Sequence, residues 1–89
     1  MNKLDLETIG SNLRRCIKEF NSTHDEKFSE CFERACIDGE MNLTDYNIIY
    51  RYQSGKKRPS LLTLVVLANL LNVSPDELLS WWMKVHLFV

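Results

Sequence analysis

The middle of the chain holds basic residues that no acidic residue compensates. Between residues 46 and 75 there is no Asp or Glu, and the local net charge of +4 comes from Arg51, Lys56, Lys57 and Arg58. Residues 1–45 carry six basic and ten acidic side chains, a net of −4, and residues 76–89 carry a net of −1. A polyanion responds to the local field more than to the total charge of −1. The basic segment therefore predicts a phosphate-rich partner.

Cysteine and histidine are the other residues that could do chemistry. Cys16, Cys31 and Cys36 form no CxxC pair, and the last two lack the spacing of zinc ligands, so we expect no metal. Their odd number favours free, largely buried thiols in a reducing compartment. His24 and His86 are expected at the surface. Since no Ser/His/Asp set, carboxylate pair or glycine-rich phosphate loop occurs, we expect no enzyme, no cofactor and no small-molecule substrate.

Length and composition predict one domain over residues 1–89. A chain of 89 residues with 45% hydrophobic residues, three Gly and two Pro can build one core and has no room for a second. Residues 1–5 do not resemble a secretory signal, and the longest nearly apolar run, residues 64–71, is too short to span a bilayer. We expect a cytoplasmic binding module that does not associate with membranes.

The first half of the chain predicts two amphipathic helices. Asp5 is expected to cap the first, and Thr23 with Glu26 forms a capping-box pattern that predicts a second helix over residues 23–38, ended by Gly39. The outer face of the second helix is acidic. The apolar stripes with helical period are Ile9, Leu13, Cys16, Ile17 and Phe20, then Phe28, Cys31, Phe32, Ala35 and Cys36.

The second half predicts three shorter helices. The third is expected to start at Thr44 or Asp45 and to end before an exposed basic turn. Ser60 is expected to cap the fourth, Asn72 to end it in a left-handed conformation, and Ser74 to cap a fifth that has Pro at its first position. The predicted fold is all-α with five helices. The inward residues expected in the third helix are Ile48, Ile49 and Tyr52.

Residues 46–79 carry a longer pattern, in which an isoleucine, an aromatic residue, Gln and Gly precede two basic residues, Pro-Ser, a Leu-rich helix and Asn-Val-Ser. It resembles the second half of the lambda-repressor/Cro-like helix-turn-helix family, and residues 9–20 resemble the first helix of that family. The predicted second helix is longer than in the family. The residues that carry the resemblance are Ile49, Tyr52, Gln53, Gly55, Lys56, Lys57, Pro59, Ser60, Leu61, Leu64, Leu67, Ala68, Leu71, Asn72, Val73, Ser74, Leu78 and Leu79.

The resemblance implies a transcription regulator, of the small phage or mobile-element repressor type, that binds double-stranded operator DNA. It implies that the third helix reads bases in the major groove through Asp45, Tyr46, Asn47, Tyr50 and Arg51. It also implies phosphate contacts by Lys56, Lys57, Arg58 and Ser60. Alternatives stay open: Tyr46 and Tyr50 pack on the second helix, Asp45 is only a cap, and the basic turn is solvated.

The fourth helix and the C-terminal segment hold more hydrophobic residues than one small core can cover. We expect an association surface made of Leu62, Val65, Val66, Trp81, Trp82, Leu87 and Phe88. The resemblance implies a homodimer through this region, whereas the open alternative is that the tail folds back on the second helix. A second function also stays open, an antitoxin or anti-repressor module whose helix-turn-helix scaffold binds a protein. The acidic second helix and the apolar tail favour that alternative.

Overall fold

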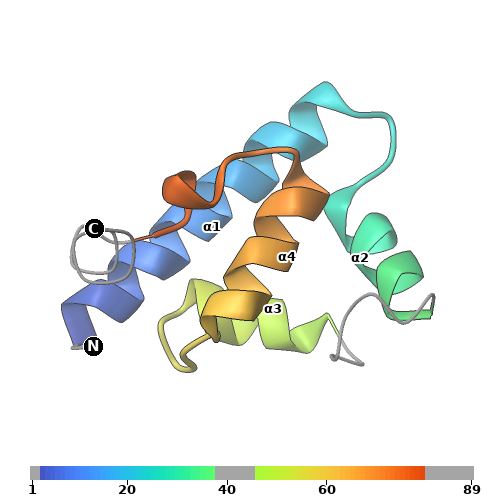
Figure 1. The fold of residues 1–89 in the computed structure, drawn as a ribbon. Helices are drawn as coiled ribbons and strands as arrows, with labels where there is room; N and C mark the ends of the chain where they lie inside the picture. Colours follow the sequence, from blue (N-terminus) through green and yellow to red (C-terminus); the bar gives the residue numbers. More distant parts are fainter. Residues whose placement is uncertain (1–2, 38–45, 80–89) are drawn as a thin grey trace.

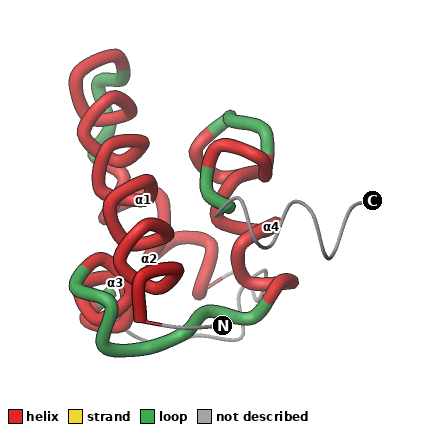
Figure 2. Tube along the Cα trace, turned by 90° about the vertical axis from the view of Figure 1, so that its left-hand side faces the viewer, coloured by secondary structure: helices red, strands yellow, loops and turns green. Residues whose placement is uncertain are grey.

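The computed structural model describes residues 3–37 and 46–79, which form four α-helices and one 3-10 turn (Figure 1). The elements are α1 (Lys3–Thr23), α2 (Phe28–Ile37), α3 (Asn47–Gln53), α4 (Leu61–Leu71) and η1 (Pro75–Glu77). No β-strand occurs in the described residues, which appear in Figure 2 as helices joined by loops. The all-helical prediction is confirmed. The predicted fifth helix is not, because only η1 follows Ser74 in the described part of the chain.

The core forms where the other helices pack on α1. α1 contacts α2, α3 and α4, and α4 also contacts α2 and η1 (Figures 1 and 2). The five residues of the first predicted stripe are all buried, and in the second stripe only Cys31 and Cys36 lie at the edge of the core. Among the described residues, the buried side chains of the hydrophobic core are Ile9, Leu13, Cys16, Ile17, Phe20, Phe28, Phe32, Ala35, Ile49, Tyr52, Leu64, Leu67, Ala68, Leu71, Leu78 and Leu79.

The boundary between α1 and α2 differs from the prediction. α1 starts at Lys3, so Asp5 lies inside the helix and does not cap it. Thr23 belongs to the last turn of α1, where its hydroxyl donates to the carbonyl oxygen of Glu19 over 2.9 Å. α2 begins only at Phe28, whose amide donates to Oδ1 of Asn21 over 2.8 Å. The predicted helix over residues 23–38 is therefore wrong at its start, because a side chain of α1 caps α2 in place of the capping box.

The ends of α3 and α4 follow local capping rules. α3 begins at Asn47, later than predicted, with Tyr46 at the N-cap position; Thr44, Asp45 and Gly39 lie outside the described residues. The hydroxyl of Ser60 accepts the amide of Thr63 over 3.1 Å, which confirms the predicted cap of α4. α4 ends at a left-handed residue with φ of 58°, the predicted Asn72. Ser74 accepts an amide of η1, as predicted for a cap.

The backbones of α1 and α3 lie close together at Gly10. A Cβ atom at this position would lie 2.4 Å from the carbonyl oxygen of Gln53 and 2.6 Å from that of Tyr52. Because any side chain would meet the backbone of α3, only glycine permits this packing. The contact presses one face of α3 against α1 and so determines which face of α3 remains exposed.

Candidate nucleic-acid interface

α3 has a buried face and an exposed face. Ile49 and Tyr52 are buried, and Ile48 packs half-buried against the core, which confirms the three predicted inward residues. The opposite stripe follows the helical period and is exposed. It consists of Asn47, Tyr50, Arg51 and, just after the helix, Ser54. Polar side chains on an exposed helix face are of the kind that contact base edges in a groove of a duplex.

The turn after α3 folds back onto the end of the helix, at the lower left of Figure 1. Gly55 has φ of 73°, and the amides of Lys56 and Lys57 donate to the carbonyl oxygen of Arg51 over 3.0 and 3.3 Å. The amide of Gly55 donates to the carbonyl oxygen of Tyr52 over 3.2 Å, so the helix ends in a Schellman motif. The motif holds the backbone of the turn against the last turn of the exposed face.

We call Arg51, Lys56, Lys57 and Arg58 the basic corner. All four side chains are exposed. Within residues 3–37 and 46–79, none of them forms an ion pair, since the ion pairs of this part of the chain join Arg15 with Glu19 and Arg34 with Glu26. The charge of the basic corner is therefore not neutralised by the described part of the fold.

Tyr46 packs on α2, which is the alternative to base contact that the sequence analysis left open. Its ring is half-buried and packs edge-on against Phe32 of α2, with 5.5 Å between ring centroids, and against Phe28 at 6.3 Å. Burial raises the pKa of the Tyr46 phenol to about 12. Tyr46 thus contributes packing between α2 and α3. Its burial depends on where α2 lies, which no local pattern around residue 46 reveals.

The other predicted contact residues differ in their surroundings. The side chain of Tyr50 is 58% exposed, and its ring stands edge-on to Tyr46 with centroids 5.3 Å apart. Asn47 is exposed at the start of α3. The hydroxyl of Ser60 is already engaged with the amide and the hydroxyl of Thr63, as a cap. Asp45 lies outside the described residues.

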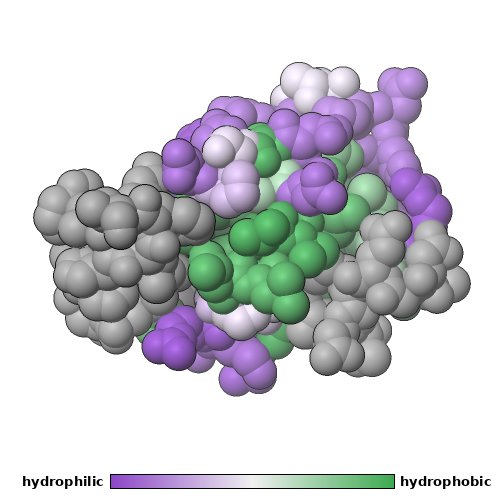
Figure 3. Space-filling view, viewed as in Figure 1, coloured by the Kyte–Doolittle hydropathy of each residue, from purple (hydrophilic) through white to green (hydrophobic). Residues whose placement is uncertain are grey.

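Two residues of the predicted association surface, Leu62 and Val65, are exposed on α4. Leu62 is 73% exposed and Val65 39%, and Leu61 beside them is 37% exposed. Figure 3 shows hydrophobic side chains gathered in the middle of the face seen in Figure 1, over α4. Val66 lies half-buried against the core, and four members of the predicted surface lie outside the described residues: Trp81, Trp82, Leu87 and Phe88.

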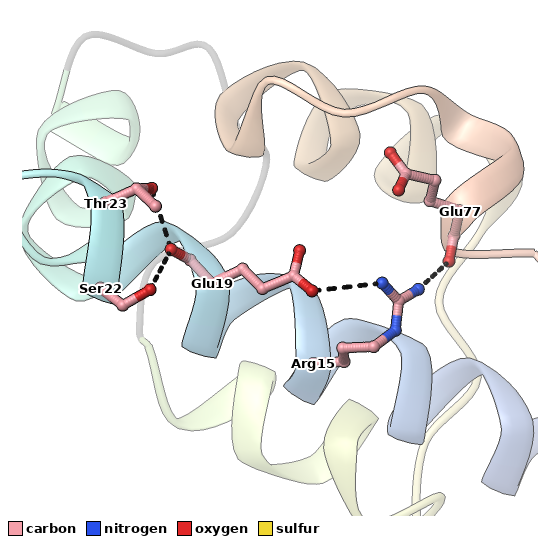
Figure 4. Close-up of polar contacts among 5 residues, drawn as sticks. All are labelled: Arg15, Glu19, Ser22, Thr23 and Glu77. Carbon is pink, nitrogen blue, oxygen red and sulfur yellow. Dashed lines mark hydrogen bonds and ion pairs between the residues drawn. The ribbon is translucent and has the colours of Figure 1, made fainter.

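Arg15 of α1 and Arg34 of α2 form polar contacts within the fold. The guanidinium of Arg15 lies 3.7 Å from the carboxylate of Glu19 and donates over 3.5 Å to the carbonyl oxygen of Glu77, so it joins α1 to η1 (Figure 4). Arg34 of α2 forms a two-pronged ion pair with Glu26. The hydrogen bond from Arg34 lowers the pKa of the Glu26 carboxyl. These arginines serve the structure of the fold.

The cysteines are free thiols in the structure. Cys16 is buried, and burial raises the pKa of its thiol, whereas Cys31 and Cys36 are half-buried. Within the described residues, no group of three His, Cys, Asp or Glu side chains could hold a metal ion. In the same residues, no helix combines the length and the apolar character that a membrane crossing requires.

No protein-family model, no curated protein and no solved structure matches this chain. The likeness to lambda-repressor/Cro-like proteins therefore depends on the residue patterns of residues 9–20 and 46–79 alone.

Proposed function

We propose that this protein is a cytoplasmic regulator that binds double-stranded DNA in a sequence-specific manner and acts as a repressor by occupying an operator as a dimer. One observation carries the proposal: the amides of Lys56 and Lys57 bind the carbonyl oxygen of Arg51, so the basic corner continues directly from the exposed face of α3. Its side chains pair with no carboxylate of residues 3–37 and 46–79. A helix face of polar side chains next to clustered cations is the arrangement that reads bases and holds phosphates.

In this proposal each part of the surface has its own role. α3 enters the major groove, where Asn47 can pair with adenine and Arg51 with guanine through two hydrogen bonds each. The exposed ring of Tyr50 contacts a thymine methyl group, or its hydroxyl contacts a phosphate. Lys56 and Lys57 neutralise phosphates beside the groove. Their contribution makes the affinity strongly dependent on salt, because each neutralised phosphate releases counterions.

The exposed face of α4 supports dimer formation. Leu61, Leu62 and Val65 form an apolar surface that a two-fold axis would cover with the same residues of a second copy. Two copies related in this way present two α3 helices to one face of a duplex, about 34 Å apart in a site of two half-sites. Dimer formation then raises both affinity and operator length.

The same surfaces support a second candidate, an antitoxin or anti-repressor module that binds another protein. The exposed apolar face of α4 favours it, together with the exposed acidic residues of α2, Glu30 and Glu33. Such a module needs neither the exposed face of α3 nor the charge of the basic corner. Binding to DNA by the purified protein alone therefore favours the regulator.

The test is enrichment of genomic fragments by the purified protein, followed by titration of the enriched fragment. We expect a small set of fragments that share a two-fold symmetric site, and an affinity for it at least about 1,000-fold above that for unrelated DNA at physiological salt. The test variant is Asn47→Ala. Its matched control is Ser11→Ala, which changes an exposed residue of α1. Asn47→Ala should reduce selectivity by about 10-fold and Ser11→Ala should not. Uniform recovery of all fragments would contradict the proposal.

A further inference from the structure

Six aromatic rings form a continuous series from the end of α1 to the outside of α3. His24 stacks on Phe20 at 3.9 Å, Phe20 meets Phe28 edge-on at 5.7 Å, and Phe28 contacts Phe32 at 6.3 Å. Phe28 and Phe32 both contact Tyr46, which in turn contacts Tyr50. All members before Tyr46 belong to α1, α2 or the loop between them. The series therefore links the interior of the fold to one exposed side chain.

Only the last ring of the series is on the candidate interface. Tyr50 is 58% exposed. An exposed side chain normally exchanges between rotamers, so a ligand that fixes one of them must overcome a loss of conformational entropy. The ring of Tyr46 stands at 89° to that of Tyr50, an edge-to-face contact that favours one rotamer of the exposed ring. Tyr46 is itself held by two rings of α2. Through Tyr46, the packing of α2 thus favours one rotamer of Tyr50.

We propose that Tyr46 is a positioning residue for DNA recognition, which reads no base itself but holds the Tyr50 ring in the orientation that contacts the duplex. The inference rests on the proposed function of α3. It gives α2 a role in recognition through its inner aromatic face, although its outer face is acidic and unsuited to a phosphate backbone.

The first arm of the test needs no DNA. The chain holds three tyrosines, so tyrosine-selective isotope labelling gives few ring signals. In the wild type we expect nuclear Overhauser contacts between the rings of Tyr46 and Tyr50. In Tyr46→Phe the signals of Tyr50 should stay near their wild-type positions, and in Tyr46→Leu they should move toward those of a freely rotating tyrosine. Absence of the ring–ring contacts in the wild type would overturn the proposal even if Tyr46→Leu fails to fold.

The second arm measures binding to the enriched operator. Tyr46→Leu should weaken binding about 3- to 10-fold, Tyr46→Phe should restore it, and Tyr46→Leu should cause no further loss once Tyr50 is Ala. Equal losses in both backgrounds, or no rescue by phenylalanine, would overturn the positioning role. If the wild type shows the ring contacts but binds no DNA, the proposed function fails and the role in recognition fails with it. If it binds DNA without the ring contacts, only the positioning role fails.

Discussion

Two sets of cations, one in each half of the described chain, have opposite surroundings. In α1 and α2, Arg15 and Arg34 bind carboxylates of the same chain, and Arg15 also reaches the backbone of η1. In α3 and the turn after it, the four side chains of the basic corner are exposed and pair with no carboxylate of the described residues. The net charge of the chain therefore does not indicate what each cation does. A cation paired with a carboxylate of the same chain supports the structure, and an exposed cation without such a pair can bind a phosphate.

The largest effect is expected at Gly10, where the two halves touch. Gly10→Ala inserts a Cβ atom 2.4 Å from the backbone of α3, so α3 must move away from α1. We expect a loss of about 2–3 kcal/mol in the free energy of unfolding, measured by urea denaturation. Binding to the operator should fall as well, because the exposed face of α3 loses its support. Ser11→Ala, on the exposed side of α1, is the matched control and should change neither quantity.

The next effect concerns the apolar face of α4, which contains no cation and so lies outside the comparison of charges. Leu62→Lys adds a charge where 73% of the side chain is exposed, so the monomer should fold normally. Burying that ammonium group in a dimer is unfavourable, and we expect the dissociation constant of the dimer to rise at least about 10-fold in sedimentation equilibrium. Ser11→Lys adds the same charge on α1 as the control. A dimer unaffected by Leu62→Lys would exclude this face from the interface.

A smaller effect concerns Tyr46, whose ring joins the two halves. Its pKa is raised to about 12 in the folded protein from its usual value near 10, so the folded state holds the phenolic proton more tightly than the unfolded chain does. Stability from this group is therefore complete below pH 10 and is lost as the pH rises toward 12. We expect a decrease of about 1 kcal/mol, below the full linkage value because the side chain is partly exposed.

The measurement is urea denaturation of the wild type and Tyr46→Phe at a series of pH values above about 9. Burial also raises the pKa of Tyr52 and of the Cys16 thiol, so both proteins should lose stability in alkali. The variant should lose less, by the contribution of Tyr46. Identical pH profiles would show that the phenol of Tyr46 is not buried at the contact between α2 and α3.

The sequence predicted best what depends on neighbours along the chain. The spacing of Ile9, Leu13 and Phe20 identified the buried face of α1, and the caps at Ser60 and Asn72 formed as expected, because both features are local. The capping box at Thr23 failed because the amide of Phe28 binds a side chain seven positions earlier, a contact that depends on how the loop folds.

The candidate site was predicted in part. The inward and outward faces of α3 follow from its period, and the exposure of the basic corner follows from its charge. The burial of Tyr46 depends on the packing of α2, and no pattern in the residues around it predicts this burial. The signal that could have indicated it is the pair of aromatic residues on the preceding helix, Phe28 and Phe32, which contact Tyr46.

The central claim is that the basic corner is open to phosphates, whereas Arg15 and Arg34 are held by carboxylates of the fold. It is tested most directly by the salt dependence of operator binding for Lys57→Ala and Arg15→Ala, with urea denaturation of both. Lys57→Ala should reduce the slope of log affinity against log salt by about 0.9 and leave stability within about 0.5 kcal/mol. Arg15→Ala should keep the wild-type slope and lose up to about 1 kcal/mol of stability. Equal slopes in the wild type and both variants would contradict the account.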